Sequence, residues 1–308
     1  MKHLDPLYGE YEFDGVFRDL IQHDAVQRLK HVSMHGAGSL VVPELATPRY
    51  DHALGVAILV REYGSGEREQ LAGLLHDVFT PSFAGALTLL GRDLAGAREE
   101  LLGDGIGAVL ADHGFDPDTV FDTEPFGVLT RAPPDIGADQ LDHVCRDLVA
   151  LEELEREDIR DLVAGLRVID GRLVADSVDA ANELLDASIA HAEQVRFRPE
   201  LEAARVAMAD LLDRALEEDI IEEQDLFARD DTVLEAIEDS RLADDLTAIN
   251  PSMDVVNGGR RVPRHLTMVD PPVQDPYTRL SDIDPSAGDR LDGFQEETAD
   301  EAGYGTPF

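Results

Sequence analysis

The sequence predicts a mainly α-helical fold with a small β-hairpin and an extended C-terminal arm. Three observations predict it. Apolar residues recur at helical spacing through most of the chain, two β-prone runs are joined by Asp170-Gly171, and proline is concentrated near the C-terminus. The chain has 308 residues, of which 43% are hydrophobic and 30% are charged, so we expect a folded protein with a large hydrophobic core.

The first half of the chain carries helical segments separated by turns. Asp24 and Asp51 are suited to cap two of the helices. A third helix is expected over roughly residues 67–78, where four apolar side chains share one face: Leu71, Leu74, Leu75 and Val78. A stretch rich in Pro, Gly and Asp interrupts the pattern between residues 112 and 138, and helical spacing resumes from Leu141 to Leu151.

The second half begins with the predicted hairpin. The runs 166–169 and 172–175 are joined by Asp170-Gly171, the residue pair that a type I′ turn prefers. Further helices are expected over residues 178–191, 199–218 and 231–239. Seven of the 16 prolines fall in the last 58 residues. We therefore expect one helical domain over residues 1–245, and over residues 246–308 an extended arm that continues from Asp284 as a disordered acidic tail.

The chain is strongly acidic, with 65 Asp and Glu against 26 Lys and Arg and a formal net charge of −39. Only Lys2 and Lys30 are lysines, and tryptophan is absent. Nucleic acids and anionic membranes are bound through basic surfaces, so this composition argues against both as partners. An acidic surface of this kind suits molar salt, where the Debye length is about 3 Å, and we expect a halophilic source.

Cys145 is the single cysteine, which excludes an internal disulfide and a cysteine-rich zinc site. No uninterrupted apolar run reaches the roughly 18 residues of a membrane span, and residues 1–6 lack a signal-peptide core. The sequence therefore predicts a soluble, cytoplasmic protein.

Histidine and carboxylate remain as candidate metal ligands. His76-Asp77 ends the third helix, and His52 lies in the helix before it. Asp139 begins a later helix, with His143 one turn further on the same face. A single histidine on a helix is more often structural than a ligand, so spacing alone leaves both interpretations open.

Several motifs occur together in one order along the chain. They are Asp5-Pro6-Leu7-Tyr8-Gly9, Gln27-Arg28-Leu29-Lys30, Arg49-Tyr50-Asp51-His52-Ala53-Leu54-Gly55-Val56, Leu71-Ala72-Gly73-Leu74-Leu75-His76-Asp77, Gly137-Ala138-Asp139-Gln140-Leu141-Asp142-His143 and Arg146-Asp147. This order resembles HD-domain phosphohydrolases, and within that superfamily it is most similar to the deoxynucleoside-triphosphate triphosphohydrolase branch. The resemblance covers roughly residues 4–240.

The resemblance implies an HD-domain helical bundle with one divalent metal ion, which could be Mn, Fe, Ni, Zn or Mg. Its implied ligands are His52, His76, Asp77 and Asp139. It also places Arg49 close to the site, where a guanidinium could bind a phosphate; a salt bridge to a carboxylate is the alternative interpretation of Arg49.

Other positions depart from the branch's pattern. Members of this branch have histidines three and eight residues after the His-Asp pair, where this chain has Thr80 and Gly85. They also have a catalytic His-Glu pair on the next helix, and its nearest equivalent in this chain is Arg98-Glu99. In nucleotide-hydrolysing relatives a lysine and a tyrosine follow the last metal-binding Asp, and at these positions this chain has Gln140 and His143. We therefore expect an intact set of metal ligands beside altered acid–base groups.

Two histidines could replace the missing acid–base group. His143 shares a helix face with Asp139 and, together with Asp77, is the candidate catalytic residue. His113, beside Gly114 at a helix end, is the second candidate, although interaction with the helix dipole is the simpler interpretation. The other histidines match no position of the pattern and are expected to be structural or surface residues: His3, His23, His31, His35, His191 and His265.

The resemblance predicts a metal-dependent phosphohydrolase that acts on a nucleotide or another small phosphate ester, with a metal-activated water as the nucleophile. The alternative is a catalytically weakened HD protein that binds metal and nucleotide as a sensor or assembly partner. The family's habit and the C-terminal arm favour a homo-oligomer.

Overall fold

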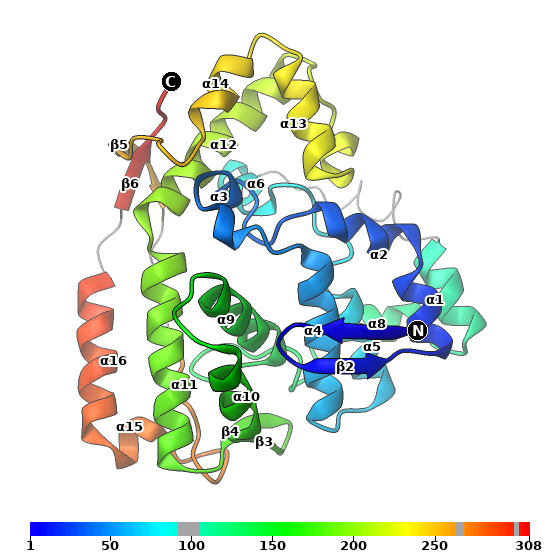
Figure 1. Cartoon of the computed structure of the whole chain (residues 1–308), viewed down its shortest axis with the longest axis vertical. Coiled ribbons are helices and arrows are strands. Elements are labelled where there is room, and N and C mark those ends of the chain that lie inside the picture. The colour runs from blue at the N-terminus through cyan, green and yellow to red at the C-terminus, as the bar shows by residue number, and fades with distance from the viewer. Residues whose placement is uncertain (92–104, 263–267, 299–301) are drawn as a thin grey trace.

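The computed structural model describes residues 1–91, 105–262, 268–298 and 302–308 (Figure 1). In these ranges the chain is mainly helical, and its strands form small two-stranded antiparallel sheets. The predicted mainly α-helical fold with a small β-hairpin is therefore confirmed. Among the helices of these ranges, none is both long and apolar enough to cross a membrane.

One apolar cluster surrounds helix α4 (Arg49–Glu62), in which every residue from His52 to Val60 is buried. A helix that is apolar on all sides belongs at the centre of a bundle. Helices α5 (Glu67–Leu75) and α9 (Ala138–Ala150) pack against α4, α11 (Val178–His191) packs against α9, and several shorter elements contribute side chains to the same cluster (Figure 1). The shorter elements are α1 (Gly15–Ile21), α2 (Asp24–Arg28), η1 (Leu29–His31), α8 (Pro117–Phe121) and α10 (Arg156–Ala164), and residues 105–112 are also helical.

A second apolar cluster surrounds α12 (Pro199–Glu217), the longest helix among the described residues. It includes side chains from α3 (Gly38–Val41), η2 (Pro43–Leu45), α6 (Ala84–Leu90), η4 (Glu223–Phe227), α13 (Asp230–Glu238) and α14 (Ala243–Ala248). The helices expected over 178–191, 199–218 and 231–239 match α11, α12 and α13 to within one residue at each end. The segment η3 (Ala192–Arg196), which joins α11 to α12, is a π-helical turn that the sequence analysis did not predict.

The predicted hairpin consists of β3 (Leu166–Ile169) and β4 (Arg172–Ala175), paired from Leu166↔Ala175 to Ile169↔Arg172. Its two turn residues, Asp170 and Gly171, have φ angles of 50° and 69°. Two successive positive φ angles define the type I′ turn, which confirms the prediction from the Asp-Gly pair.

The N-terminal region differs in detail from the prediction. A hairpin of β1 (Lys2–Asp5) and β2 (Gly9–Glu12) was not predicted. His23 caps α2, where its side chain accepts the amide of Ala25, so Asp24 is the first helical residue. Pro48 precedes α4, so Asp51 lies in the first turn, where its charge suits the helix dipole.

The C-terminal region differs from the expected disordered tail. Residues 268–273 are extended and run beside β4, where Ala175 donates its amide to Pro272, as expected of an arm. After α15 (Leu280–Ile283), however, Pro285–Thr298 form helix α16, which lies beside α11 (Figure 1). Its buried side chains, Ala287, Leu291 and Phe294, recur at helical spacing and join the first cluster. The chain ends with β6 (Ala302–Gly305), paired with β5 (Val256–Val262) against α12. The division at residue 245 stays a prediction.

Candidate metal centre and active site

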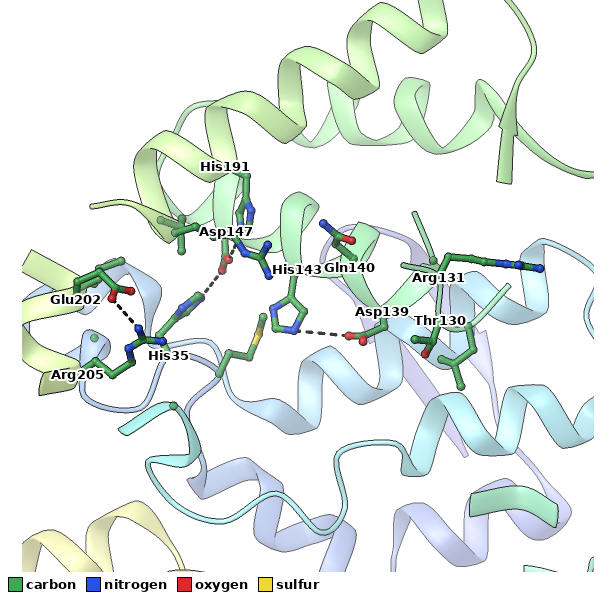
Figure 2. A pocket seen from close by; sticks show the side chains of 18 residues that line it. His35, Thr130, Arg131, Asp139, Gln140, His143, Asp147, His191, Glu202 and Arg205 are labelled. Atoms are coloured by element: carbon green, nitrogen blue, oxygen red, sulfur yellow. Dashed lines mark hydrogen bonds and ion pairs between the residues drawn. The ribbon is translucent and has the colours of Figure 1, made fainter. Parts of the chain in front are cut away.

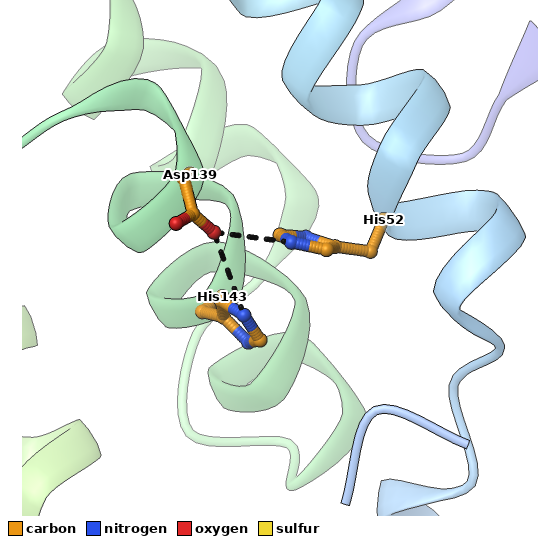
Figure 3. Close-up of side chains that lie close together, drawn as sticks. All are labelled: His52, Asp139 and His143. Atoms are coloured by element: carbon orange, nitrogen blue, oxygen red, sulfur yellow. Dashed lines mark ion pairs between the residues drawn. The ribbon is translucent and has the colours of Figure 1, made fainter. Parts of the chain in front are cut away.

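Three helices bring the predicted metal ligands together. His52 comes from the first turn of α4, His76-Asp77 directly follows α5, and Asp139 lies in the first turn of α9. Figure 3 shows Asp139 of α9 facing His52 of α4, with His143 one turn further along α9. His52 is fully buried, whereas the side chain of Asp139 is 33% exposed. The cluster is therefore buried at His52 and accessible to solvent at Asp139.

The two imidazoles present their Nε2 atoms to each other at 3.2 Å. His76 donates Nδ1–H to the carbonyl of Gly73 at 2.7 Å, and His52 donates Nδ1–H to the carboxylate of Asp142 at 2.7 Å. In the neutral form, both Nε2 atoms therefore carry a lone pair with no hydrogen between them. Such an arrangement is stable only if a cation, either a proton or a metal ion, lies at this point.

The surrounding distances fit a shared coordination sphere. Asp139 Oδ1 lies 3.2 Å from His52 Nε2 and 3.6 Å from His76 Nε2. Asp77 Oδ2 lies 4.0 Å and 3.7 Å from the same two atoms. Ligand atoms that share one metal at about 2.0–2.2 Å lie roughly 3 to 4 Å apart, so the residues present fit a divalent metal ion. The donors form two overlapping groups that share His52: His52, His76 and Asp77, and His52, Asp139 and His143.

The charges at the centre also call for a cation. Burial alone would lower the pKa of His52, but Asp139 and Asp142 raise it to about 9. Burial alone would raise the pKa values of Asp77 and Asp139. However, Arg49 lowers the pKa of Asp77 and a hydrogen bond with His52 lowers that of Asp139, so both pKa values fall well below their usual range. Two partly buried carboxylates are thus held ionised around the histidine pair.

A buried network supports His52 from behind. Asp142 Oδ2 also accepts a hydrogen bond from Arg146 Nε at 2.7 Å, and Arg146 Nη2 donates a hydrogen bond to Asp5 Oδ2 at 2.7 Å. Gly55 gives this network its room, because a Cβ on Gly55 would lie 2.1 Å from Arg146 Nη2 and 2.2 Å from Asp142 Oδ1. A carboxylate that accepts Nδ1–H from a histidine fixes the ring and its tautomer, which is the usual support of a metal-binding imidazole.

Arg49 lies directly beside the centre. Its Nη1 is 2.5 Å from Asp77 Oδ2, its Nη2 donates to the carbonyl of Met34, and its Nε has no hydrogen-bond partner in the described structure. Thr80 donates its hydroxyl to the other oxygen of Asp77 at 2.7 Å. Arg49 therefore makes the salt bridge that was the alternative interpretation, and it makes it to a candidate metal ligand.

His143 faces the centre, as the sequence spacing predicts. Its Nε2 is 3.6 Å from Asp139 Oδ1, and its ring centroid is 4.1 Å from that of His52. Burial and the neighbouring charge on His52 lower the pKa of His143 well below its usual value. The side chain also lines a cavity of about 420 Å³ that opens beside Asp139.

The far end of this cavity holds a cluster that the sequence analysis missed. Asp147 is fully buried, and its two oxygens accept hydrogen bonds from His35 Nε2 at 2.8 Å and His191 Nε2 at 2.9 Å (Figure 2). We call these three residues the His-Asp-His clamp. The expected structural or surface role of His35 and His191 did not include a place in the cavity wall. One signal was available, because Asp139, His143 and Asp147 recur every four residues on one face of α9.

The remaining candidates lie elsewhere or serve other contacts. His113 Nε2 lies 3.0 Å from Asp19 Oδ2, a contact that neither interpretation of His113 predicted, and no contact of His113 with the metal-ligand cluster is seen among the described residues. Gly85 and Gln140 line the cavity. Arg98-Glu99 and His265 lie outside the described residues.

Comparisons with known proteins find phosphohydrolases among the proteins that this chain resembles. No protein-family model matches the chain. The chain is 28% identical over 289 residues to the uncharacterised protein YdhJ of Bacillus subtilis, covering 89% of this chain and 88% of that protein. It is 30% identical over 179 residues to the metal-dependent phosphohydrolase cns2 of Cordyceps militaris, covering 56% and 52%. It is 28% identical over 131 residues to a deoxynucleoside triphosphate triphosphohydrolase SAMHD1 homolog of Dictyostelium discoideum, covering 36% and 26%.

Two solved structures resemble the fold over most of the chain. A hypothetical protein from Aquifex aeolicus matches with a TM-score of 0.68 at 20% identity, over 85% of this chain and 78% of that one. A phosphohydrolase from Bacteroides thetaiotaomicron matches with a TM-score of 0.65 at 19% identity, over 81% and 76%. At this identity the likeness concerns the fold.

The relatives named metal-dependent phosphohydrolase and deoxynucleoside triphosphate triphosphohydrolase homolog support the resemblance of this chain to HD-domain phosphohydrolases. The donor set and these names indicate a divalent metal.

Proposed function

We propose that this protein is a metal-dependent hydrolase of small phosphate esters, with nucleotides as the first substrates to test. One observation carries the proposal: the carboxylates of Asp77 and Asp139 each have an oxygen within 4.0 Å of the facing Nε2 atoms of His52 and His76, and Asp139 also lines a cavity. The name of the Dictyostelium relative, a deoxynucleoside triphosphate triphosphohydrolase homolog, supports a nucleotide as the substrate.

The proposed ligands are His52, His76, Asp77 and Asp139. A divalent metal ion held by them would supply Lewis acidity toward water and toward a phosphoryl oxygen. Arg49 fixes Asp77 and directs its positive charge to the same place, where a phosphate oxygen can accept from the guanidinium.

His143 is the proposed acid–base residue. It lies in the cavity wall, with its Nε2 3.6 Å from Asp139 Oδ1, where it could accept a proton from the attacking water. The protonated imidazole could then donate that proton to the leaving oxygen.

Phosphate release by the purified full chain tests the proposal, measured in molar KCl with added Mn²⁺ on nucleoside mono-, di- and triphosphates and on a generic phosphodiester. We expect hydrolysis that stops on chelation of the metal. His143→Ala should lower the rate by about 10²–10⁴-fold, the usual contribution of a general acid or base, with metal content unchanged.

Asp292→Ala, which shortens an exposed residue of α16, is the control and should match the wild type. Metal-bound wild-type protein that hydrolyses none of these compounds would contradict the proposal. An active enzyme whose His143→Ala variant is equally fast would contradict the role of His143 alone. The homo-oligomeric state and the salt-adapted surface stay predictions, to be measured by light scattering and by melting in graded KCl.

A further inference from the structure

The two apolar clusters are joined by hydrogen bonds beside Asp77. In the segment that follows Asp77, Ser82 donates its amide to the carbonyl of Leu226, which belongs to the cluster around α12, at 2.7 Å. Arg28 of α2 crosses the same boundary, because its Nη1 donates to the carbonyl of Ala228 at 2.9 Å. Its Nη2 donates to two carbonyls of the segment after Asp77, at 3.2 and 2.7 Å. The start of α13 is therefore fixed against the segment that carries a proposed metal ligand.

Asp230, the first residue of α13, brings a carboxylate to this junction. Its Oδ2 accepts the amide of Ser33 at 2.8 Å. The next residue, Met34, accepts Arg49 Nη2 at its carbonyl, at 3.2 Å. Since Ser33 and Met34 are adjacent, the carboxylate of Asp230 and the guanidinium of Arg49 are held on the same short stretch of backbone.

The polar atoms left over at this junction are complementary. Asp230 Oδ1, Arg28 Nε and Arg49 Nε are buried and have no hydrogen-bond partner among the described residues. The first is an acceptor and the other two are donors, and such groups are costly to leave unpaired. Burial raises the pKa of Asp230, and the charges of Arg49 and Arg28 oppose that rise. Arg49 thus lies within electrostatic range of two carboxylates, those of Asp77 and Asp230.

Arg49 and a metal ion would use the same oxygen of Asp77. Arg49 Nη1 bonds Asp77 Oδ2, and this oxygen lies 4.0 Å from His52 Nε2 and 3.7 Å from His76 Nε2. The other oxygen, Oδ1, accepts the hydroxyl of Thr80. A guanidinium that pairs more strongly with Oδ2 leaves less negative charge for a cation at the histidine pair. The affinity for metal therefore depends on how tightly Arg49 holds Asp77.

We propose that Asp230 is a positioning residue of the metal centre, which shares Arg49 with Asp77 and so leaves Asp77 Oδ2 available to a metal ion. Without the charge of Asp230, Arg49 would pair more strongly with Asp77 and compete with the metal for that oxygen. Asp230 comes from the cluster around α12, whereas the proposed ligands come from elements of the cluster around α4. The inference rests on the metal centre of the proposed function and does not require hydrolysis.

Titration of the metal-free, purified full chain with Mn²⁺ tests the inference by calorimetry in molar KCl, which screens long-range attraction between charges. We expect Asp230→Asn to bind Mn²⁺ about 10- to 100-fold more weakly than the wild type, the range for residues that support metal ligands. Asparagine keeps the shape of the side chain and an oxygen for the amide of Ser33. Asp230→Glu keeps the charge and should lose less affinity than Asp230→Asn.

A double-mutant cycle shows whether Asp230 acts through Arg49. In the Arg49→Gln variant no guanidinium remains to be shared, so adding Asp230→Asn should not weaken Mn²⁺ binding further. Asp231→Asn is the matched control, because it removes the same charge from the next residue of α13. The side chain of Asp231 is 52% exposed and lies 3.7 Å from His31, and this variant should bind Mn²⁺ as the wild type does.

Three results would overturn the inference: equal affinities of Asp230→Asn and Asp231→Asn, equal losses in Asp230→Asn and Asp230→Glu, or a full loss in the Arg49→Gln background. An Asp230→Asn chain that circular dichroism shows to be unfolded would also overturn it, because Asp230 would then serve the fold and not the metal centre.

The inference and the proposed function can fail separately, because binding is measured without turnover. An affinity that depends on Asp230 in a chain that hydrolyses nothing would sustain the inference and contradict the proposed function. Metal-dependent hydrolysis with an affinity that does not depend on Asp230 would do the reverse. A wild type that binds no Mn²⁺ would overturn both.

Discussion

At one end of the cavity, the Nε2 atoms of His52 and His76 face each other 3.2 Å apart with no hydrogen between them in the neutral form. At the other end, Asp147 accepts a hydrogen bond at each of its oxygens, from His35 and from His191. Both ends are built from histidine and aspartate, but the first leaves lone pairs directed at an open point and the second satisfies its own groups. Composition alone therefore does not identify a metal site; the direction of the donor atoms does.

The largest effect should separate the two ends by metal content. Asp77→Asn removes a charge from the open end, and we expect the purified variant to retain little or no divalent metal. Asp147→Asn makes the same chemical change at the far end and should keep its metal. Elemental analysis after gel filtration measures both. A chelator should lower the melting temperature of the wild type and of Asp147→Asn, because a ligand that binds the native state stabilises it, and should leave Asp77→Asn unchanged.

Equal metal content in the two variants would break the comparison, whether both kept the metal or both lost it. Circular dichroism shows whether the variants remain folded, which they should, because neither change alters the apolar cluster around α4.

The two ends also differ in how far the sequence could reveal them. The open end was found because its ligands lie in motifs that resemble a known family and occur in a fixed order. The His-Asp-His clamp joins residues 112 and 44 positions apart in the chain, and no local pattern brings His35, Asp147 and His191 together. Such contacts depend on how α9, α11 and the segment before α3 pack.

The fold shows the same division between local and long-range information. Helix α11 and the β3–β4 hairpin follow from spacing and turn chemistry, so they were predicted closely. The C-terminal helix α16 was missed because its acidic composition suggested disorder, although Ala287, Leu291 and Phe294 already had helical spacing. In the structure these side chains are buried against the bundle, and Arg290 binds Asp186 and Asn182 of α11.

A second, smaller effect concerns the support behind the open end. Gly55→Ala would place a methyl group 2.1 Å from Arg146 and 2.2 Å from Asp142, so the buried network behind His52 must move. We expect a loss of about 3 kcal/mol in the free energy of unfolding, in the range measured for overpacked cores and disrupted buried ion pairs. Urea denaturation measures it.

Gly293→Ala is the matched control, because its Cβ meets no atom within 4 Å and lies in helix α16. That variant should be equal to the wild type or more stable by about 0.5–1 kcal/mol, since alanine is the better helix former. If the two variants had the same stability, the network behind His52 would not need the space that Gly55 leaves.

The smallest effect is a pH dependence at the outer end of the same network. Burial would raise the pKa of Asp5, but His3, Arg146 and the amide of Leu7 lower it to about 2, from 3.8 for a free side chain. A carboxyl whose pKa is lower in the folded state stabilises the protein above its unfolded-state pKa, and this stabilisation is lost as the pH falls from about 4 to about 2. The lowering corresponds to about 2 kcal/mol. We therefore expect Asp5→Asn to be less stable than the wild type by about that amount at pH 6. This gap in the free energy of unfolding should narrow toward pH 2, as measured by denaturation at graded pH.

The exposed Asp112→Asn is the control, and its gap in the free energy of unfolding should be the same at every pH. A gap for Asp5→Asn that is the same at pH 6 and pH 2 would show that Asp5 is not ionised in its contact with Arg146, and the network behind the metal centre would then lack its outermost charge.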